Sequence, residues 1–328
     1  MYSVFVTRKL PGPGLDRLRE FCEVSIFPAD RNITKEELLQ VIPQQDAVIT
    51  MLADPVDADV IAAGSKLKAI ANYAVGFNNI DIAAATRRGV AVLNTPDVLS
   101  EATADLAWAL LLAAARRVVE ADGFVRSGRF TGWSPELLLG VEVYGKTLGV
   151  VGAGRIGQAV ARRAAGFGMR ILYYNRRRLP KAVEQELHLT YADLATVLQE
   201  ADFISLHCPL TPDTRHLIGA AELRLMKPTA ILINTSRGPV VDEAALVAAL
   251  KEGRIFGAGL DVFEQEPALH PELAGLPNVV LAPHIGSAAT ETRQRMVDLV
   301  VSGVLAVLQG SRPSNLVNPE IFEREGSR

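Results

Sequence analysis

The sequence predicts an α/β protein with two doubly wound parallel sheets, in which a Rossmann-type domain is inserted into a flavodoxin-like domain. Three observations predict this fold. Short apolar or β-branched runs alternate with helical segments from end to end. A glycine-rich turn at 152–157 lies between a strand-like and a helix-like segment. A strong helical segment at 288–308 follows the last expected strand, and we expect it to return to the first domain.

Composition limits the class of protein. The chain has 328 residues, enough for about two domains of 100 to 200 residues each. Its formal net charge of −3 provides no general positive field, so we expect no nucleic-acid partner. The longest apolar run, 106–115, is far shorter than the ~20 residues that cross a bilayer, so we expect no membrane partner. Cys22 and Cys208 have neither metal-ligand nor redox-pair spacing, which predicts a cytoplasmic, reduced protein without a metal.

The first hundred residues contain five expected strands with helical stretches between them. Thr34 followed by Glu37 forms a capping-box pattern, which predicts the start of a helix before Leu38. The strands are expected at 2–6, 23–27, 46–50, 68–72 and 90–93.

A second series of strands follows a long helix that is expected at 101–120 and forms one crossing between the domains. Six strands alternating with helices are typical of a dinucleotide-binding sheet. We therefore expect a dinucleotide-binding domain at 100–286 and a substrate domain made of 1–99 plus 287–328. The six strands are expected at 148–151, 170–174, 203–206, 230–234, 256–260 and 279–282.

The turn at 152–157 reads Gly-Ala-Gly-Arg-Ile-Gly and is flanked by a strand and a helix. In this context Gly152 permits the tight turn, Gly154 lets the backbone approach a pyrophosphate, and Gly157 lets helix and strand pack closely. Amides at the helix start would then bind the phosphates. A turn selected only for packing is the alternative, and the flanking elements favour the nucleotide site.

The end of the second strand in this unit predicts which nicotinamide cofactor binds. An acidic residue at this position selects NAD through the ribose 2′-hydroxyl. The chain has Asn175 here, followed by Arg176, Arg177 and Arg178, and guanidinium groups suit a 2′-phosphate. We therefore expect NADPH as the preferred cofactor, with NADH possible. A solvated basic loop is the alternative.

Reduction of a carbonyl needs a proton donor and a cation that holds an anionic substrate. His207 and His284 follow expected strands, at the sheet edge where such folds bind ligands, and His284 is the better acid because it lies at the return to the substrate domain. Arg237 also follows a strand and suits a carboxylate, while Glu266 would keep His284 charged. Structural histidines and surface ion pairs are the alternatives. The remaining histidines lie in expected loops or helix starts, and they are His188, His216 and His270.

Several motifs in this order resemble the D-isomer-specific 2-hydroxyacid dehydrogenases, and within them the glyoxylate/hydroxypyruvate reductases. The resemblance covers nearly the whole chain. It implies NAD(P)H-dependent reduction of a small 2-oxoacid to the 2-hydroxy acid, with Arg237, Glu266 and His284 as the catalytic set. The motifs are the segments 74–81, 152–157, 207–211, 234–238, 261–267 and 283–286.

The resemblance also implies binding residues. It assigns the substrate carboxylate to the backbone amides of Val75 and Gly76 and to Arg237, and it places Trp133 in the substrate pocket of a homodimer partner. Asp261 would bind the nicotinamide carboxamide, and Cys208 would be a wall residue of the cofactor groove. The complete implied cofactor set is Thr103, Gly152, Gly154, Arg155, Ile156, Gly157, Asn175, Arg176, Arg177, Cys208, Pro209, Thr214, Thr235, Asp261, His284 and Gly286.

Two other functions stay open from the sequence. A D-lactate or D-3-phosphoglycerate dehydrogenase would use the same motifs. A nucleotide-sensing binding protein, similar to the C-terminal-binding corepressors, can keep the same catalytic set. Formate dehydrogenases have glutamine where this chain has Glu266, which argues against that activity.

Overall fold

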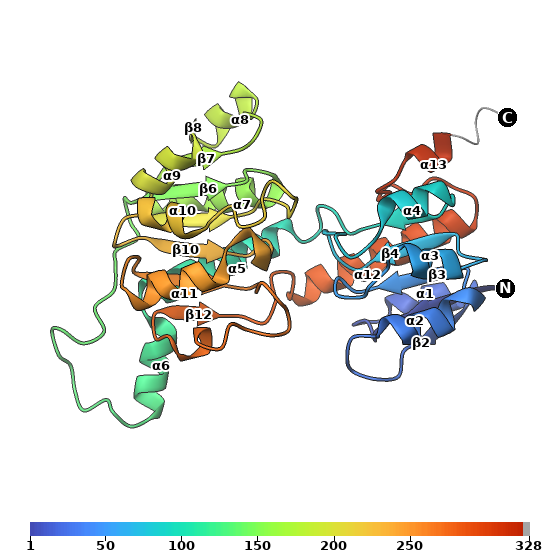
Figure 1. Ribbon diagram of the computed structural model, residues 1–328, viewed down its shortest axis with the longest axis horizontal. Helices are drawn as coiled ribbons and strands as arrows, with labels where there is room; N and C mark the ends of the chain where they lie inside the picture. The colour runs from blue at the N-terminus through green and yellow to red at the C-terminus, as the bar shows by residue number, and fades with distance from the viewer. Residues whose placement is uncertain (324–328) are drawn as a thin grey trace. The chain divides into compact units, whose positions relative to one another are not determined.

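The computed structural model describes residues 1–323, and the chain forms two compact units (Figure 1). One unit comprises Met1–Leu99 together with the chain from Ala288 onward, and the other comprises Ser100–Ser287. Each unit has its own parallel sheet covered by helices. The chain therefore leaves the first unit once and returns to it.

The first unit contains a five-stranded sheet in the order β2-β1-β3-β4-β5, with every neighbouring pair parallel. This is the flavodoxin-like order that the sequence predicts. Its strands are β1 Tyr2–Val6, β2 Cys22–Ile26, β3 Ala47–Thr50, β4 Ala69–Asn72 and β5 Ala91–Leu93. Its helices are α1 Gly14–Arg19, α2 Lys35–Val41, α3 Ala58–Ala63, α4 Ile82–Arg87, α12 Thr290–Leu308 and α13 Glu320–Glu323, with a 3-10 turn η1 at Ile42–Gln44.

The predicted helix start at Thr34 is confirmed. The Thr34 hydroxyl accepts from the Glu37 amide at 3.2 Å, and the Glu37 carboxylate accepts from the Thr34 amide at 2.9 Å. These two bonds satisfy amides that the first helical turn leaves without partners. Helix α2 consequently begins at Lys35.

The C-terminal part of the chain completes the first unit. Helix α12 packs against α1 and β4, and its buried side chains include Met296, Val300 and Val304. Beyond it, Leu316 pairs with Leu93 in an antiparallel bridge, which adds a short segment to the free edge of β5. Residues near both ends of the described chain, among them Phe5 and Val317, thus pack in one hydrophobic core.

The second unit contains a seven-stranded parallel sheet in the order β12-β11-β10-β9-β6-β7-β8. The first six strands along the chain have the Rossmann order, and β12 adds an edge. The strands are β6 Thr147–Val151, β7 Arg170–Tyr174, β8 Leu189–Tyr191, β9 Phe203–Leu206, β10 Ile231–Asn234, β11 Gly257–Leu260 and β12 Val279–Leu281. The helices are α5 Ser100–Ala115, α6 Val118–Arg126, α7 Arg155–Ala164, α8 Lys181–Glu186, α9 Leu194–Glu200, α10 Ala220–Leu225 and α11 Glu243–Lys251, with 3-10 turns η2 Ala165–Phe167, η3 Gly238–Val240 and η4 Leu273–Gly275.

Two details of the second unit correct the sequence predictions. The expected six strands omit β8, because only Leu189 of its three residues is buried and no apolar run marks it. The expected helix at 101–120 is broken at Arg117, which has the left-handed φ of 52° and is the N-cap of α6. Neither glycine nor proline lies at this break, so the sequence contains no stop signal there. Within residues 1–323, no helix has the length and apolarity needed to span a membrane.

Candidate active site

The glycine-rich turn has the geometry of an anion site. Gly152 has φ of 96°, and a Cβ there would lie 2.5 Å from the amide nitrogen of Cys208. A Cβ on Gly157 would lie 2.2 Å from the carbonyl oxygen of Gly152, whereas Gly154 faces open space. Helix α7 then begins at Arg155 without a side-chain cap. Its first amides are therefore suited to the pyrophosphate of a dinucleotide, and the residues present fit that group.

Asn175, at the end of β7, is bonded to this turn. Its Oδ1 accepts from the Ala153 amide at 2.7 Å, which leaves its Nδ2 as a hydrogen-bond donor. Arg176 is exposed, with a distant ion pair of 3.7 Å to Asp213, and Arg177 is also exposed. Two guanidinium groups beside Asn175 are thus accessible to a ligand.

Arg178 corrects the expectation of three arginines at this position. Its guanidinium makes two bonds to Glu184, of 2.7 and 2.9 Å, and the Tyr173 hydroxyl donates to the same carboxylate. Arg178 and then Tyr173 lower the pKa of Glu184 to about 2. Although 57% of its side chain is exposed, Arg178 is therefore bonded to Glu184 in a structural network, unlike Arg176 and Arg177.

The two histidines selected from the sequence have different environments. His207 follows β9, and its ring nitrogens lie 2.8 Å from the Ser205 hydroxyl and 3.4 Å from the Thr235 hydroxyl. Burial lowers the pKa of His207 to about 3, so this ring is neutral at pH 7. A neutral imidazole with two hydroxyl partners is a poor proton donor to an alkoxide, which leaves His284.

His284 forms an acid pair with Glu266. The His284 Nδ1 lies 2.8 Å from the Glu266 Oε2, and the Glu266 Oε1 accepts from the Phe263 amide at 3.0 Å. Burial tends to raise the pKa of Glu266, but its bond to His284, that residue's charge, the Phe263 amide and Arg237 together lower it. The carboxylate is therefore ionised at neutral pH. With Nδ1 bound to Glu266, Nε2 is the ring nitrogen that can transfer a proton.

Asp261, at the end of β11, holds the backbone around His284. Its two carboxylate oxygens accept from the amides of Ile285, at 2.7 Å, and Gly286, at 2.8 Å. Its carbonyl accepts from the His284 amide at 2.9 Å. These bonds fix His284 at the left-handed φ of 55°, a conformation that is uncommon for residues other than glycine. Burial raises the pKa of Asp261, so the two amides stabilise a carboxylate that has little water around it.

Arg237 follows β10 on a turn that packs against the Glu266 segment. A Cβ on Gly238 would overlap the Phe263 carbonyl oxygen at 1.8 Å, so only glycine allows this approach. The Asn234 side chain donates to the Arg237 carbonyl at 3.0 Å and stabilises the turn. Burial lowers the pKa of Arg237, whereas the charge of Glu266 raises it. The second unit thus brings a guanidinium, an imidazole and a carboxylate to one edge of its sheet.

The segment Ala74-Val75-Gly76 of the first unit has a backbone in which every carbonyl is bonded. Ala74 O accepts from the Thr95 amide at 2.9 Å. Val75 O accepts from Asn94 Nδ2 at 2.8 Å, and Gly76 O accepts from Asn72 Nδ2 at 2.7 Å. Among residues 1–323, the amides of Val75 and Gly76 have no bonded acceptor. Neither Asn72, the last residue of β4, nor Asn94, the residue after β5, was predicted from the sequence, although both lie at strand ends as the candidate site residues do.

Comparison with known proteins identifies the family. The model of the D-isomer specific 2-hydroxyacid dehydrogenase NAD binding domain matches residues 108–286. The chain belongs to the D-isomer specific 2-hydroxyacid dehydrogenases. Glyoxylate reductases of Thermococcus gammatolerans and Thermococcus litoralis are 54% and 55% identical to it, over 98% of this chain and 97% and 98% of theirs.

Solved structures agree with this family and fold. A Thermus thermophilus protein has a TM-score of 0.91 and 50% identity, covering 96% of this chain and 99% of that one. An NADPH-dependent glyoxylate/hydroxypyruvate reductase from Sinorhizobium meliloti, in complex with NADP and malonate, has a TM-score of 0.85 and 35% identity, with 96% of each chain covered. The doubly wound two-unit architecture is therefore that of the 2-hydroxyacid dehydrogenases.

The remaining predicted cofactor residues of this dehydrogenase lie at or near the same sheet edge of the second unit, whereas Trp133 lies in the exposed segment between α6 and β6. Thr103 of α5 is buried beside Gly286, where an added Cβ would meet it at 3.3 Å. The Thr214 hydroxyl donates to the Pro209 carbonyl at 2.6 Å and shapes the loop after β9. Burial raises the pKa of the Cys208 thiol to about 11, so it remains protonated, as a wall residue would. No group of three or more possible metal ligands occurs among residues 1–323.

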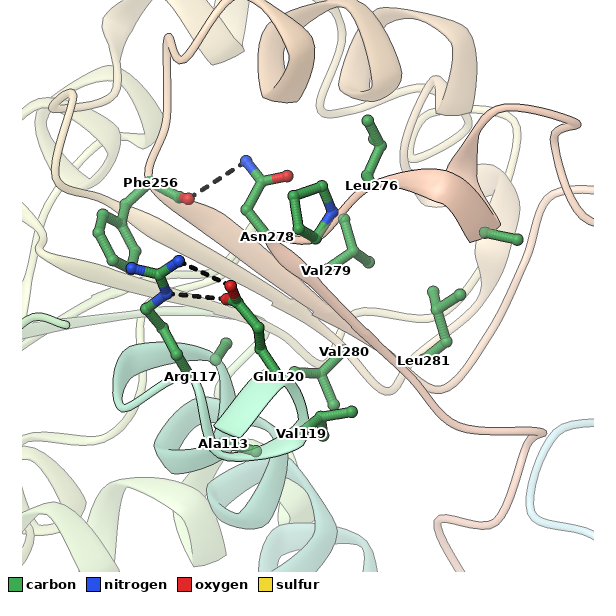
Figure 2. A pocket seen from close by; sticks show the side chains of 13 residues that line it. Ala113, Arg117, Val119, Glu120, Phe256, Leu276, Asn278, Val279, Val280 and Leu281 are labelled. Carbon is green, nitrogen blue, oxygen red and sulfur yellow. Dashed lines mark hydrogen bonds and ion pairs between the residues drawn. The ribbon is translucent and has the colours of Figure 1, made fainter. Parts of the chain in front are cut away.

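A separate cavity of about 570 Å³ lies beside α6 and the edge strand β12 (Figure 2). Its lining is mostly apolar, from Phe256, Leu276 and the β12 side chains, and it contains the Arg117–Glu120 ion pair. None of the predicted site residues lines it. Helix α6 and the segment between α6 and β6 expose large apolar side chains, namely Val118, Val119, Val125, Phe130, Trp133, Leu139 and Tyr144.

Proposed function

We propose that this dehydrogenase reduces glyoxylate, hydroxypyruvate or both to the 2-hydroxy acid, with NADPH preferred over NADH. The observation that carries the proposal is the His284–Glu266 pair, 2.8 Å apart, on the unit that also holds Arg237 and the glycine-rich turn. The relatives named glyoxylate reductase, at 54% and 55% identity, support this substrate class.

The proposed reaction uses three side chains of the second unit, Arg237, Glu266 and His284. The nicotinamide, when bound at the glycine-rich turn, would supply the hydride that the carbonyl carbon accepts. Arg237 binds the substrate carboxylate and polarises the carbonyl, while His284 gives its Nε2 proton to the oxygen that becomes the hydroxyl. Glu266 stabilises the imidazolium before this transfer. The amides of Val75 and Gly76, which have no bonded acceptor among residues 1–323, are our proposed donors to the carboxylate.

A panel of 2-oxoacids tests the function. Glyoxylate- or hydroxypyruvate-dependent loss of NADPH absorbance is expected, with pyruvate and phosphohydroxypyruvate slower. Preference for one of these latter two would instead indicate a D-lactate or D-3-phosphoglycerate dehydrogenase. Tight NADPH binding without turnover on any oxoacid would support the nucleotide-sensing protein.

Glu266→Gln is expected to change the pH dependence of reduction. Because the pKa of Glu266 lies below its usual value, the carboxylate is charged across the neutral range, and its stabilising effect is lost only as pH falls through that lowered pKa. The neutral amide cannot stabilise an imidazolium in the same way. The alkaline limb of the kcat profile should therefore move to lower pH, measured as initial rates of NADPH oxidation. A limb at the wild-type pH would contradict the role of Glu266.

Asn94→Asp is expected to weaken binding of the oxoacid. The variant places a carboxylate oxygen where Asn94 Nδ2 now donates to the Val75 carbonyl at 2.8 Å. The carboxylate oxygen and the Val75 carbonyl oxygen, which are both hydrogen-bond acceptors, would then face each other, and the Val75–Gly76 backbone would shift. The KM for glyoxylate should rise roughly tenfold, since about 1.4 kcal/mol corresponds to a factor of ten. The Kd for NADPH, measured by fluorescence, should stay within twofold, and an unchanged KM would exclude this loop from substrate binding.

We also propose that the protein forms a homodimer in the cytoplasm. The exposed apolar side chains of 118–144, of which Val119 also lines the cavity in Figure 2, are candidates for the subunit interface. Trp133, with 85% of its surface exposed, is the candidate that would enter the partner's substrate pocket. The cysteines Cys22 and Cys208 are free, as a reducing compartment requires. Sedimentation equilibrium of the wild type and of Trp133→Ala tests the homodimer. The KM of the two proteins for glyoxylate tests the place of Trp133 in the partner's substrate pocket.

A further inference from the structure

His216 contacts both segments that carry the proposed catalytic groups of the second unit. It lies just before α10, in a stretch that the sequence analysis set aside as a loop. We propose that His216 is a positioning residue, which holds the Glu266 segment against the Arg237 turn. This inference rests on the proposed role of Glu266 in the reaction.

The backbone of His216 is bonded to the Arg237 turn. The His216 amide donates to the Pro239 carbonyl at 2.8 Å, and the Ile218 amide donates to the Val240 carbonyl at 3.1 Å. His216 has the left-handed φ of 51°, and the bonds on both sides of it specify that conformation. Residues 216–218 therefore lie alongside the turn that begins at Arg237 and are hydrogen-bonded to it.

The side chain of His216 is bonded to the Glu266 segment. Its Nε2 lies 2.6 Å from the Glu264 Oε1, and the other oxygen of Glu264 accepts from the Glu243 amide at 3.3 Å. Glu264 lies two residues before Glu266, in a tight turn that the bridge between Gln265 and Ala268 closes. The turn is thus held through Glu264 by His216 and through Glu266 by His284.

The other charged groups near Glu264 hold it less well. Arg215 lies 3.4 Å from the same carboxylate oxygen, and 56% of its side chain is exposed, compared with 39% for His216. Glu243 contributes a backbone amide. Burial raises the pKa of its own carboxyl, the backbone hydrogen bond from Glu264 lowers it, and the charges of Glu264 and His270 have smaller and opposite effects. His216 is consequently the closest side-chain partner of Glu264 among these groups.

Loss of this contact should reduce catalysis without reducing cofactor binding. Displacement of a catalytic group by about 1 Å can lower a rate as much as 10²-fold. His216→Ala keeps the backbone bond to Pro239 and removes only the side-chain bond to Glu264, so we expect kcat for glyoxylate to fall roughly tenfold. His216→Gln, whose amide can donate to Glu264, should restore kcat to within about threefold of wild type.

Arg215→Ala is the matched control, because it removes the neighbouring side chain that reaches the same carboxylate from farther away. Its kcat should stay within twofold of wild type. The Kd for NADPH and the thermal midpoint, measured for all three variants, should change little. A kcat of His216→Ala within twofold of wild type would overturn the inference, as would an equal loss in Arg215→Ala.

A second comparison separates positioning from general damage. If His216 acts through Glu266, adding His216→Ala to Glu266→Gln should cause no further loss of kcat. If the loss of kcat in the double variant equals the product of the losses in the two single variants, His216 acts by another route, and the inference is overturned.

Hydrogen exchange keeps the inference testable if Glu266 has no catalytic role. The Phe263 amide donates to Glu266, so exchange in 263–268 reports directly on the order of this turn. Should Glu266→Gln retain wild-type kcat, the proposed reaction fails at that residue, and exchange alone decides the positioning. Faster exchange at 263–268 in His216→Ala, but not in Arg215→Ala, would support it, and equal exchange would overturn it.

Discussion

His284→Ala is expected to lower kcat for reduction of glyoxylate by about 10² to 10⁴, the range for loss of a positioned general acid. The variant removes the proton donor and leaves Glu266 without its partner at 2.8 Å. The backbone should remain in place, because Asp261 holds the amides of Ile285 and Gly286 independently of the imidazole. NADPH fluorescence should therefore give a nearly unchanged Kd while absorbance assays show the loss of turnover.

His188→Ala is the matched control for this variant. His188 is an exposed histidine of the same unit and also has a left-handed φ, of 51°, so both substitutions place alanine in a similar backbone conformation. Its kcat should equal that of wild type. Wild-type turnover in His284→Ala would remove this residue from the mechanism, and the burial that lowers the pKa of His207 to about 3 makes that histidine a poor replacement.

Arg176→Ala is expected to weaken NADPH by roughly ten- to hundredfold and to leave NADH nearly unaffected. One charged hydrogen bond contributes about 1.5 to 3 kcal/mol, and about 1.4 kcal/mol corresponds to a factor of ten. The ion pair of Arg176 with Asp213, at 3.7 Å and with both side chains exposed, holds the guanidinium only weakly. The loss should occur mainly in KM, measured for both cofactors at saturating glyoxylate.

Asn175→Asp should add to this change in specificity. A carboxylate would accept from the free 2′-hydroxyl of NADH and repel the 2′-phosphate of NADPH. Arg170→Ala is the control, since Arg170 lies at the opposite end of β7 and pairs with Glu200 at 2.8 Å. Equal losses for the two cofactors in Arg176→Ala, or a strong wild-type preference for NADH, would show that the arginines form only a solvated loop.

Much of the site could be predicted from local sequence because the fold is a parallel α/β fold. The carboxyl ends of parallel strands meet at one edge, so residues that directly follow strands become neighbours. Arg237 after β10 and His284 after β12 were found in this way, whereas the role of Asp261 after β11 was implied by the family resemblance. The glycine-rich turn at 152–157 was also predicted from the sequence. The structure gives the reason for two of its glycines, because backbone atoms lie where a side chain on Gly152 or Gly157 would be.

The sequence by itself determined the alternation of strands and helices, the glycine-rich turn and the selection of candidate residues, because these depend on short-range patterns. Only the tertiary structure decided how each candidate is used. In the folded chain, Arg178 is hydrogen-bonded to Glu184, and Asn94 is hydrogen-bonded to the Val75 carbonyl. Burial lowers the pKa of His207. The tertiary structure also broke the helix at Arg117, where no glycine or proline marks the end. These outcomes depend on which groups folding brings within hydrogen-bond distance and which it removes from water, and local residue patterns do not specify either.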